Sequence, residues 1–219
     1  MPRLTTVLFD LDGTLIDSVR LILDSYHHTL ACHGQEPCSD EFWLAGLGTP
    51  LRVQFRQWAD DPVRLEAMIG TYREYNLAHH DTRVAAYPGV VEMVRAIRRA
   101  GYRTGLVTSK NRPGAMRGLR LIGLEAEIEL IIGADDVEHP KPHPEPVTLA
   151  LARLGEPASS ALYVGDSIHD MESGRAAGVA TAAVLWGPFG RTHLECTAPD
   201  HWLETPDDLL RLLMADGCV

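Results

Sequence analysis

Five short apolar runs alternate with helical patterns along most of this chain. The runs are residues 4–9, 104–108, 130–133, 161–164 and 181–185, and several are rich in branched side chains, as is typical of buried strands. Amphipathic patterns that indicate helices lie between them, at residues 90–100, 112–122, 144–154 and 170–177. Because strands that return through helices make right-handed crossovers, this order predicts an α/β, Rossmann-like fold with a mostly parallel sheet and helices on both faces.

Residues 17–85 interrupt the alternation directly after the first run. This segment contains no convincing strand pattern and shows helical patterns at residues 19–31, 40–44, 51–58 and 62–79. We therefore expect an inserted all-α cap domain at residues 17–85 and an α/β core domain formed by residues 1–16 and 86–219. Both ends of the insertion would lie at the carboxyl edge of the sheet, where a cap could move over the site as a lid. A helical layer docked rigidly on the core is the alternative.

The charge of the chain restricts its partners. A formal net charge of -10 at pH 7 and a pI of about 5.4 argue against nucleic acid and anionic membranes, which both reward clustered Lys and Arg. No apolar run approaches the roughly 20 residues of a membrane span, and nothing resembles a secretory signal. The four cysteines form no C-x-x-C element, so we expect free thiols and a cytoplasmic protein; they are Cys32, Cys38, Cys196 and Cys218.

Two carboxylates follow the first apolar run. Asp10 and Asp12 belong to the sequence Asp-Leu-Asp-Gly-Thr, and a turn at Gly13 would direct both side chains toward one crevice. Two acids in one crevice can divide their work, one as a nucleophile and the other as an acid–base catalyst. The structural alternative is an ordinary Asp-Gly turn in which Asp12 caps the next helix.

Polar residues also follow two later runs. Thr108 and Ser109 come at an expected helix start, where a hydroxyl and free backbone N–H groups can bind phosphate oxygens. Lys141 lies in a loop that three prolines stiffen, and its ammonium could neutralise a nucleophile and a transferring phosphoryl group. A routine helix cap and a solvated loop lysine are the respective alternatives.

A second acidic pair, Asp166 and Asp170, follows the run at residues 161–164. One turn of helix would place both carboxylates on the same side, and hard oxygen ligands of this kind suit Mg²⁺. Two like charges about 4 Å apart repel by about 4 kcal/mol at an effective dielectric constant near 20. If these acids share a crevice with Asp10 and Asp12, a divalent cation would remove most of that repulsion.

These four segments, in this order and with a helical insertion after the first, resemble the haloacid dehalogenase superfamily over nearly the whole chain. The resemblance implies phosphoryl transfer, in which Asp10 attacks phosphorus to form an aspartyl phosphate. Asp12 would protonate the leaving oxygen and then deprotonate the water that hydrolyses the intermediate. Thr108 and Lys141 would hold the phosphate and the nucleophile.

The resemblance also implies the cofactor. Mg²⁺ would be held by Asp10, by the backbone carbonyl of Asp12 and by Asp166, with Asp170 bound directly or through water.

Differences among family members narrow the expected reaction. Dehalogenases and phosphonate-cleaving members lack the acid two residues after the nucleophile, whereas Asp12 is present here. Mutases of the beta-phosphoglucomutase type carry a histidine about one turn beyond the position of Ser18, where this chain has Ile22. The chain is most similar to phosphoglycolate phosphatases and bacterial pyrophosphatases. We expect a phosphatase of a small phosphorylated metabolite, as a monomer or homodimer; a sugar-phosphate mutase and a catalytically silent interaction domain are the alternatives.

The cap would select the substrate. Residues 46–52 resemble the family's substrate-facing loop, in which Gly48 permits close approach and Arg52 meets a second anionic group. A guanidinium fits a carboxylate or a phosphate, so Arg52 does not separate phosphoglycolate from pyrophosphate. A solvated helix residue is the alternative for Arg52. The histidine pairs at residues 27–28 and 79–80 are interpreted as solvated or core residues, because helical neighbours point apart.

Overall fold

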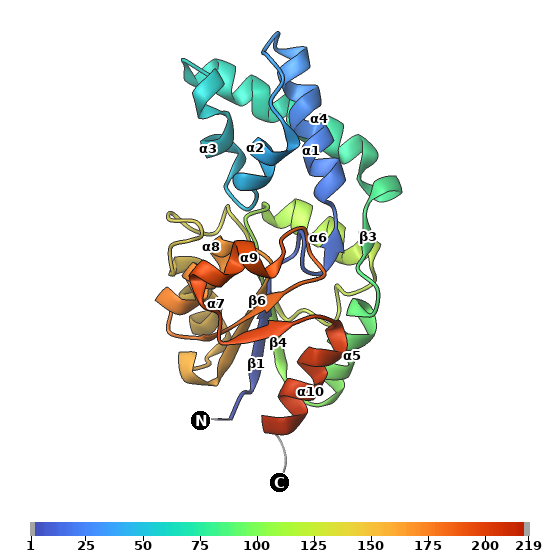
Figure 1. The fold of residues 1–219 in the computed structure, drawn as a ribbon, viewed down its shortest axis with the longest axis vertical. Helices are drawn as coiled ribbons and strands as arrows, with labels where there is room; N and C mark the ends of the chain where they lie inside the picture. The colour runs from blue at the N-terminus through green and yellow to red at the C-terminus, as the bar shows by residue number, and fades with distance from the viewer. Residues whose placement is uncertain (1–2, 217–219) are drawn as a thin grey trace.

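A six-stranded parallel sheet forms the centre of the molecule in the computed structural model, which describes residues 3–216 (Figure 1). The strand order is β5-β4-β1-β6-β7-β8. These strands are β1 (Thr6–Phe9), β4 (Arg103–Val107), β5 (Leu130–Ile132), β6 (Ala161–Gly165), β7 (Ala180–Val184) and β8 (His201–Leu203). The Rossmann-like α/β fold expected from the alternating pattern is confirmed.

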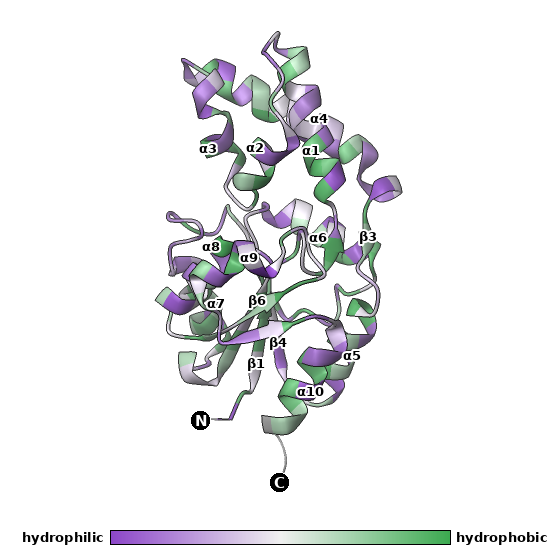
Figure 2. Cartoon of the chain, in the orientation of Figure 1, coloured by the Kyte–Doolittle hydropathy of each residue, from purple (hydrophilic) through white to green (hydrophobic). Residues whose placement is uncertain are grey.

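Helices cover both faces of the sheet because the side chains of its central strand alternate between two cores. Val7 and Phe9 of β1 pack with one set of helices, α5 (Val90–Arg99), α6 (Arg112–Leu121) and α10 (Pro206–Asp216). Leu8 points to the opposite face, where α7 (Glu145–Leu154) packs, with α8 (Ile168–Ala176) beside it. Apolar residues are concentrated along the strands and the inner faces of the helices (Figure 2).

A separate group of helices stands beyond the carboxyl ends of the strands (Figure 1). It consists of α1 (Val19–Cys32), α2 (Asp40–Ala45), α3 (Leu51–Phe55), the 3₁₀ turn η1 (Arg56–Trp58) and α4 (Pro62–Arg83). Asp61 caps α4 by accepting a hydrogen bond from the backbone of Arg64, and a proline follows it in the first turn. Tyr26 stacks on Trp43 with ring centroids 4.1 Å apart, so these helices share an aromatic core.

Two features differ from the sequence-based expectation. The segment 17–85 is not free of strands, because Asp17 and Ala85 belong to a two-stranded antiparallel ribbon formed by β2 (Ile16–Asp17) and β3 (Ala85–Ala86). The chain after residue 186 also forms α9 (Arg191–Leu194), the 3₁₀ turn η3 (Glu195–Thr197), β8 and α10. Such short strands contain too few residues for an alternating pattern to be visible in the sequence.

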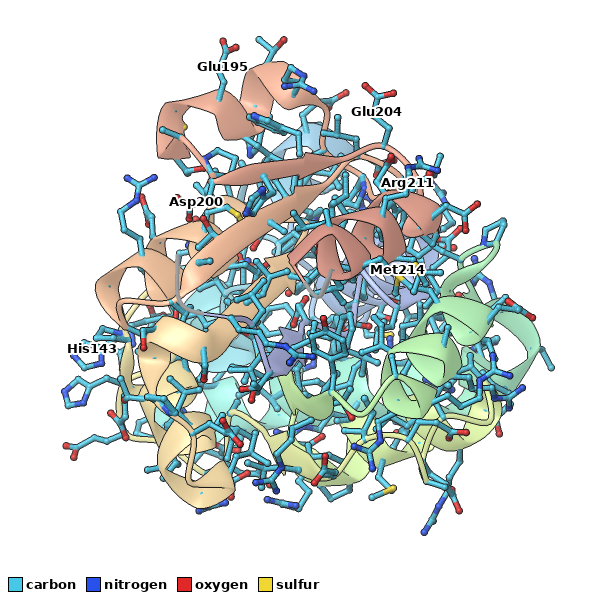
Figure 3. The ribbon with its side chains drawn as sticks, turned by 90° about the horizontal axis from the view of Figure 1, so that it is seen from below. His143, Glu195, Asp200, Glu204, Arg211 and Met214 are labelled. Atoms are coloured by element: carbon cyan, nitrogen blue, oxygen red, sulfur yellow. The ribbon has the colours of Figure 1, made fainter. Side chains whose placement is uncertain are left out.

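The last helix, α10, packs beside α5 at the lower end of the molecule in Figure 1. Figure 3 views this side and shows Arg211 and Met214 on α10, where the Met214 side chain is largely exposed. Cys32, Cys38 and Cys196 are free thiols, and Cys218 lies outside the described residues. Within residues 3–216, no helix has the length and apolar character needed to cross a membrane.

Candidate active site

The turn after β1 directs Asp10 toward the end of the neighbouring strand β6. The backbone N–H of Asp10 continues the ladder by donating to Val164 at 2.9 Å, and Gly13 makes the turn with a φ of 89°. Because β1 and β6 pair in parallel, Asp166 emerges from the same edge of the sheet. The two acidic motifs, far apart in sequence, therefore meet here.

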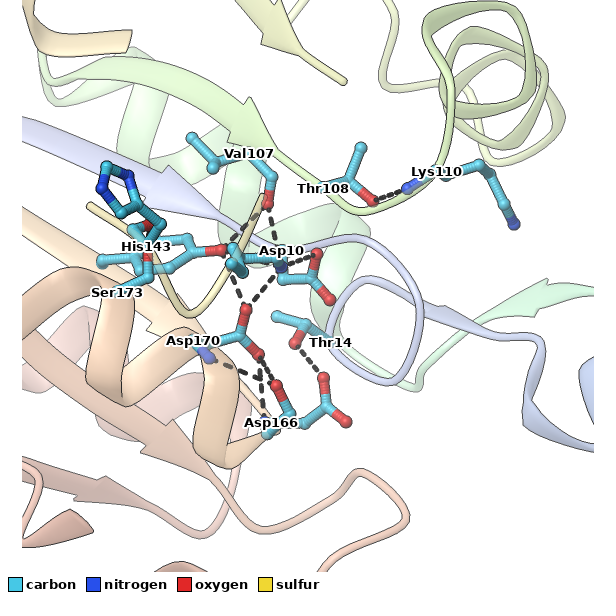
Figure 4. A network of polar contacts seen from close by, with 12 residues as sticks. Asp10, Thr14, Val107, Thr108, Lys110, His143, Asp166, Asp170 and Ser173 are labelled. Carbon is cyan, nitrogen blue, oxygen red and sulfur yellow. Dashed lines mark hydrogen bonds and ion pairs between the residues drawn. The ribbon is translucent and has the colours of Figure 1, made fainter. Parts of the chain in front are cut away.

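Three buried carboxylates form the floor of the site. Oxygen atoms of Asp10, Asp166 and Asp170 all lie within 4.8 Å of one another. Asp166 accepts a hydrogen bond on Oδ1 from the Thr14 hydroxyl at 2.9 Å (Figure 4). Its Oδ2 is buried and has no hydrogen-bond partner among residues 3–216. A buried, unpaired carboxylate oxygen beside two further carboxylates fits a divalent cation, since such ions take hard oxygen ligands.

The protonation of this cluster depends on the charges within it. Burial raises the pKa of Asp10 from 3.8 to about 7, although Lys141 opposes the shift. Burial, followed by the charges of Asp170 and Asp10, raises the pKa of Asp166 well above its ordinary value. Like charges in a buried site disfavour full ionisation, so a cation would favour the charged form of both acids.

Lys141 is a buried ion-pair partner of this cluster and not a solvated loop residue. Its Nζ lies 2.9 Å from Asp10 Oδ1 and 2.6 Å from Asp170 Oδ1, and it also donates to the Tyr163 hydroxyl at 3.1 Å. Burial would lower the pKa of Lys141, but the two carboxylates outweigh it and hold that pKa well above the ordinary value. The ammonium therefore stays charged against Asp10.

Asp170 is saturated with donors. Its Oδ1 accepts from Lys141 and from the Tyr163 hydroxyl, and its Oδ2 accepts from the backbone N–H and the hydroxyl of Ser167, which forms a capping box at the start of α8. Burial alone would raise the pKa of Asp170, but Lys141 and these hydrogen bonds lower it. The Asp166 and Asp170 carboxylates lie on the same side, as the spacing had predicted. They do so without sharing one helical turn, because Asp170 is N3 of α8 and Asp166 precedes the cap residue.

The side chain of Asp12 does not join the carboxylate cluster. It accepts from Lys110 Nζ at 2.7 Å and from the hydroxyl of Ser18, which precedes α1. The pair of Asp12 with Lys110 was not predicted, although Lys110 directly follows the expected phosphate-binding hydroxyls in sequence. Asp12 still lines the same cavity as Asp10.

Thr108 and Ser109 lie in the turn that follows β4. They were expected at a helix start, but α6 begins only at Arg112, because Asn111 caps it by accepting from the Gly114 N–H at 3.2 Å. Thr108 Oγ1 accepts from the backbone of Lys110 at 3.2 Å. The buried hydroxyl of Ser109 has no hydrogen-bond partner in the described chain.

The cap helices close one side of a cavity of about 570 Å³ above the carboxylates. Gly48 lines it with a φ of 89°, and a Cβ there would lie 3.6 Å from the Ser167 hydroxyl, so this loop approaches the core closely. Arg52 also lines the cavity, but its guanidinium pairs with Glu66 of α4 and its side chain is 55% exposed. Arg52 is thus partly solvated, as the alternative interpretation expected, although it also lines the cavity.

Tyr163 of β6 was not among the site residues predicted from the sequence. Tyr163 gives a buried strand a hydroxyl that contacts Lys141 and Asp170, and the only sequence signal is one polar group in an apolar run. His27 pairs with Asp40 and His28 is exposed, in agreement with the interpretation of that pair. His143 points outward at the rim of the molecule (Figure 3).

Comparison with known proteins decides the family. The family model described as haloacid dehalogenase-like hydrolase matches residues 7–184, a span that contains Asp10, Thr108, Lys141 and Asp166. This chain belongs to the haloacid dehalogenase-like hydrolases. The resemblance inferred from the four motifs is confirmed.

This haloacid dehalogenase-like hydrolase has curated relatives of similar length. It is 44% identical to a protein called pyrophosphatase PpaX from Anoxybacillus flavithermus, over 96% of this chain and 97% of the relative. It is 43% identical to a protein of the same name from Bacillus cereus, with the same coverage. A crystal structure of a putative haloacid dehalogenase-like hydrolase from Bacteroides fragilis superposes with a TM-score of 0.87 at 28% identity, and covers 94% of this chain and 100% of that one.

Proposed function

We propose that this chain is a Mg²⁺-dependent phosphatase that hydrolyses a small phosphorylated metabolite through an aspartyl phosphate on Asp10. The observation that carries the proposal is the pairing of a buried Asp10 with Lys141, beside the unpaired oxygen of Asp166, at the floor of a cavity. Covalent attack divides one difficult displacement into two easier steps, and fixed charges stabilise the phosphoryl group as it moves.

The proposed roles follow the position of each group. Asp10 is the nucleophile, and Lys141 holds it in place and neutralises charge that develops on the phosphoryl oxygens. Asp12, which Lys110 and Ser18 orient, protonates the leaving oxygen and then takes a proton from the attacking water. Thr108 and the unpaired hydroxyl of Ser109 bind phosphoryl oxygens.

The metal would be held by Asp10, the backbone carbonyl of Asp12, and Asp166, with Asp170 bound directly or through water. When bound, Mg²⁺ neutralises the carboxylates and the phosphate. The donors around Asp170 favour the water-mediated arrangement, because both of its oxygens already accept hydrogen bonds.

Residues 17–85 would form the cap that selects the substrate, with Gly48 and Arg52 facing it, over a core of residues 1–16 and 86–219. Among small phosphates, the names of the curated relatives support pyrophosphate, and a phosphoglycolate-type monoester fits the same cavity chemistry. A mutase is less well supported, since the residue at position 22 is the buried, apolar Ile22. The free thiols support a cytoplasmic location, and a monomer or homodimer is proposed.

Phosphate release tests the proposal directly. We expect the purified protein with Mg²⁺ to release phosphate from pyrophosphate, phosphoglycolate or another member of a panel of nucleotides and sugar phosphates. Asp10→Asn should abolish release, because an amide cannot act as the nucleophile, while the exposed Asp17→Asn should retain it. Undiminished release by Asp10→Asn would contradict the mechanism. Conversion of a sugar phosphate that outpaces release and depends on a bisphosphate primer would favour the mutase.

A further inference from the structure

His80, near the end of α4, has one ring nitrogen that no group in the described structure engages. The residue lines the cavity, although only 2% of it is exposed. Its Nδ1 lies 2.8 Å from Asp81 Oδ1, whereas its Nε2 is buried without a hydrogen-bond partner among residues 3–216. Buried polar atoms are nearly always paired, so an unpaired one in a residue that lines the cavity indicates a missing partner.

The orientation of the His80 ring is set by an ion pair between the cap helices and the core. Asp81 of α4 accepts from Arg117 of α6 through two hydrogen bonds, of 2.8 Å from Nε and 3.0 Å from Nη2. Arg117, and then His80, lower the pKa of Asp81 to about 2. Asp81 is therefore a carboxylate that can only accept, so Nδ1 of His80 carries a proton and Nε2 occupies the opposite edge of the ring.

The other cations that line the cavity are largely engaged. Four of them already form ion pairs with carboxylates of the protein. These pairs are Lys110 with Asp12, Lys141 with both Asp10 and Asp170, Arg52 with Glu66, and Arg117 with Asp81. Arg73 also lines the cavity, but it is exposed. His80 thus offers a buried nitrogen that is not committed to a protein carboxylate.

We propose that His80 recognises the substrate's leaving group by donating a hydrogen bond from Nε2 to one of its anionic oxygens. This inference rests on the proposed phosphatase function and deepens it. The oxygen belongs to the second phosphate of pyrophosphate or to the carboxylate of a phosphoglycolate-type ester. Because Nδ1 donates to Asp81, donation from Nε2 as well requires a proton on each ring nitrogen. Asp81 and Arg117 are positioning residues, because they fix the ring without contacting the substrate.

The kinetic test compares leaving groups with and without an anionic oxygen. We would measure kcat/KM with Mg²⁺ for pyrophosphate, phosphoglycolate and p-nitrophenyl phosphate. His80→Asn keeps a donor for Asp81 but removes the atom at Nε2. The ratio of kcat/KM for the anionic substrate to that for p-nitrophenyl phosphate should fall by about 10- to 100-fold. The substrate whose ratio falls identifies the leaving group.

Two further variants separate hydrogen bonding from packing. His80→Gln places an amide donor near the position of Nε2, so its ratio should stay within about threefold of the wild-type ratio. His79→Asn is the matched control, because His79 does not line the cavity and its Nδ1 lies 2.8 Å from the Tyr75 carbonyl oxygen. Its ratio should not change.

Several outcomes would overturn the inference. An unchanged ratio in His80→Asn, or an equal loss in His80→Asn and His80→Gln, shows that Nε2 donates no bond to the leaving group. In either case, the proposed function would still hold if the wild-type protein hydrolysed p-nitrophenyl phosphate and Asp10→Asn did not. If the wild-type protein released phosphate from none of the three compounds, this inference would be wrong. The proposed function would be wrong only if the nucleotides and sugar phosphates of the wider panel also released none.

Discussion

Asp10 combines two demands that oppose each other. As the proposed nucleophile it must be a carboxylate, yet it is buried beside two other acids. Lys141 at 2.9 Å favours the charged form but also shares its charge with Asp170. Removing one partner of such a buried pair leaves an uncompensated charge. In the proposed enzyme, the metal completes the neutralisation that Lys141 begins.

In the metal-free protein, we expect Asp10 to make folding less stable as pH rises. Its pKa increases from 3.8 unfolded to about 7 in the native state. Between these values the native state holds a proton that the unfolded state has released, so the free energy of unfolding falls with increasing pH. The decrease is at most about 4 kcal/mol for a shift of this size. Most of this loss of stability has occurred by about pH 7, and the ionisation of Asp10 changes the free energy of unfolding little above that pH.

Urea unfolding in EDTA at pH 5 and pH 8 measures this effect. Asp10→Asn cannot titrate at this position, so its stability should decline less over the same interval. Equal declines in the two proteins would contradict the raised pKa of Asp10.

At the scale of elements, the turn after β1 depends on a missing side chain. Gly13 has a φ of 89°, and a Cβ there would lie 2.3 Å from Asp166 Oδ2. Gly187, in the loop after β7, packs closely against this turn, because a Cβ on Gly187 would lie 2.5 Å from the Gly13 carbonyl oxygen. The unpaired oxygen of Asp166 is thus held against backbone, and its position depends on two glycines.

Gly13→Ala should therefore damage both stability and metal binding. We expect the free energy of unfolding to fall by about 2 kcal/mol or more, from the left-handed backbone and the displaced Asp166. The matched control is Gly155→Ala, which also has a positive φ, of 71°, but nothing within 4 Å of the new Cβ. It should lose about 1–2 kcal/mol and keep its response to Mg²⁺. Urea unfolding with and without Mg²⁺ measures both; identical behaviour of the two variants would refute a specific role for Gly13.

At the scale of the whole molecule, helices α1 to α4 pack against the α/β part of the chain around the cavity. Leu47 of the cap loop belongs to the same hydrophobic cluster as Met171 and Phe189 of the core. The Asp81 and Arg117 ion pair joins the two parts on another side. Release of a substrate through a moving cap would have to break both contacts.

Magnesium should stabilise this whole assembly, because a ligand bound only by the native state shifts the unfolding equilibrium. At a concentration of 100 Kd the gain is about 2.7 kcal/mol. For a chain of this size, that raises Tm by about 5–10 °C. Thermal unfolding with millimolar Mg²⁺ tests this, and Asp166→Asn should remove the increase. A flat response of the wild-type protein would count against a preformed metal site.

Local patterns in the sequence predicted most of the fold but missed its shortest elements and the last helix, α10. The helical pattern at residues 62–79 predicted α4, although the helix ends four residues later than expected. The ribbon β2 and β3 and the edge strand β8 have two or three residues each, which is too short for a periodic signal. These elements exist because neighbouring backbone groups are brought within hydrogen-bonding distance.

The sequence by itself determined the alternating α/β order, the turn at Gly13 and the presence of acids and Lys141 after the strands, because periodicity and turn chemistry are local. Only the tertiary structure decided which of these groups meet. It pairs Asp12 with Lys110 and Arg52 with Glu66, and it leaves one nitrogen of His80 without a partner among residues 3–216. Such pairings join residues from separate elements, so they depend on how the helices and the sheet pack and on which polar atoms that packing removes from water.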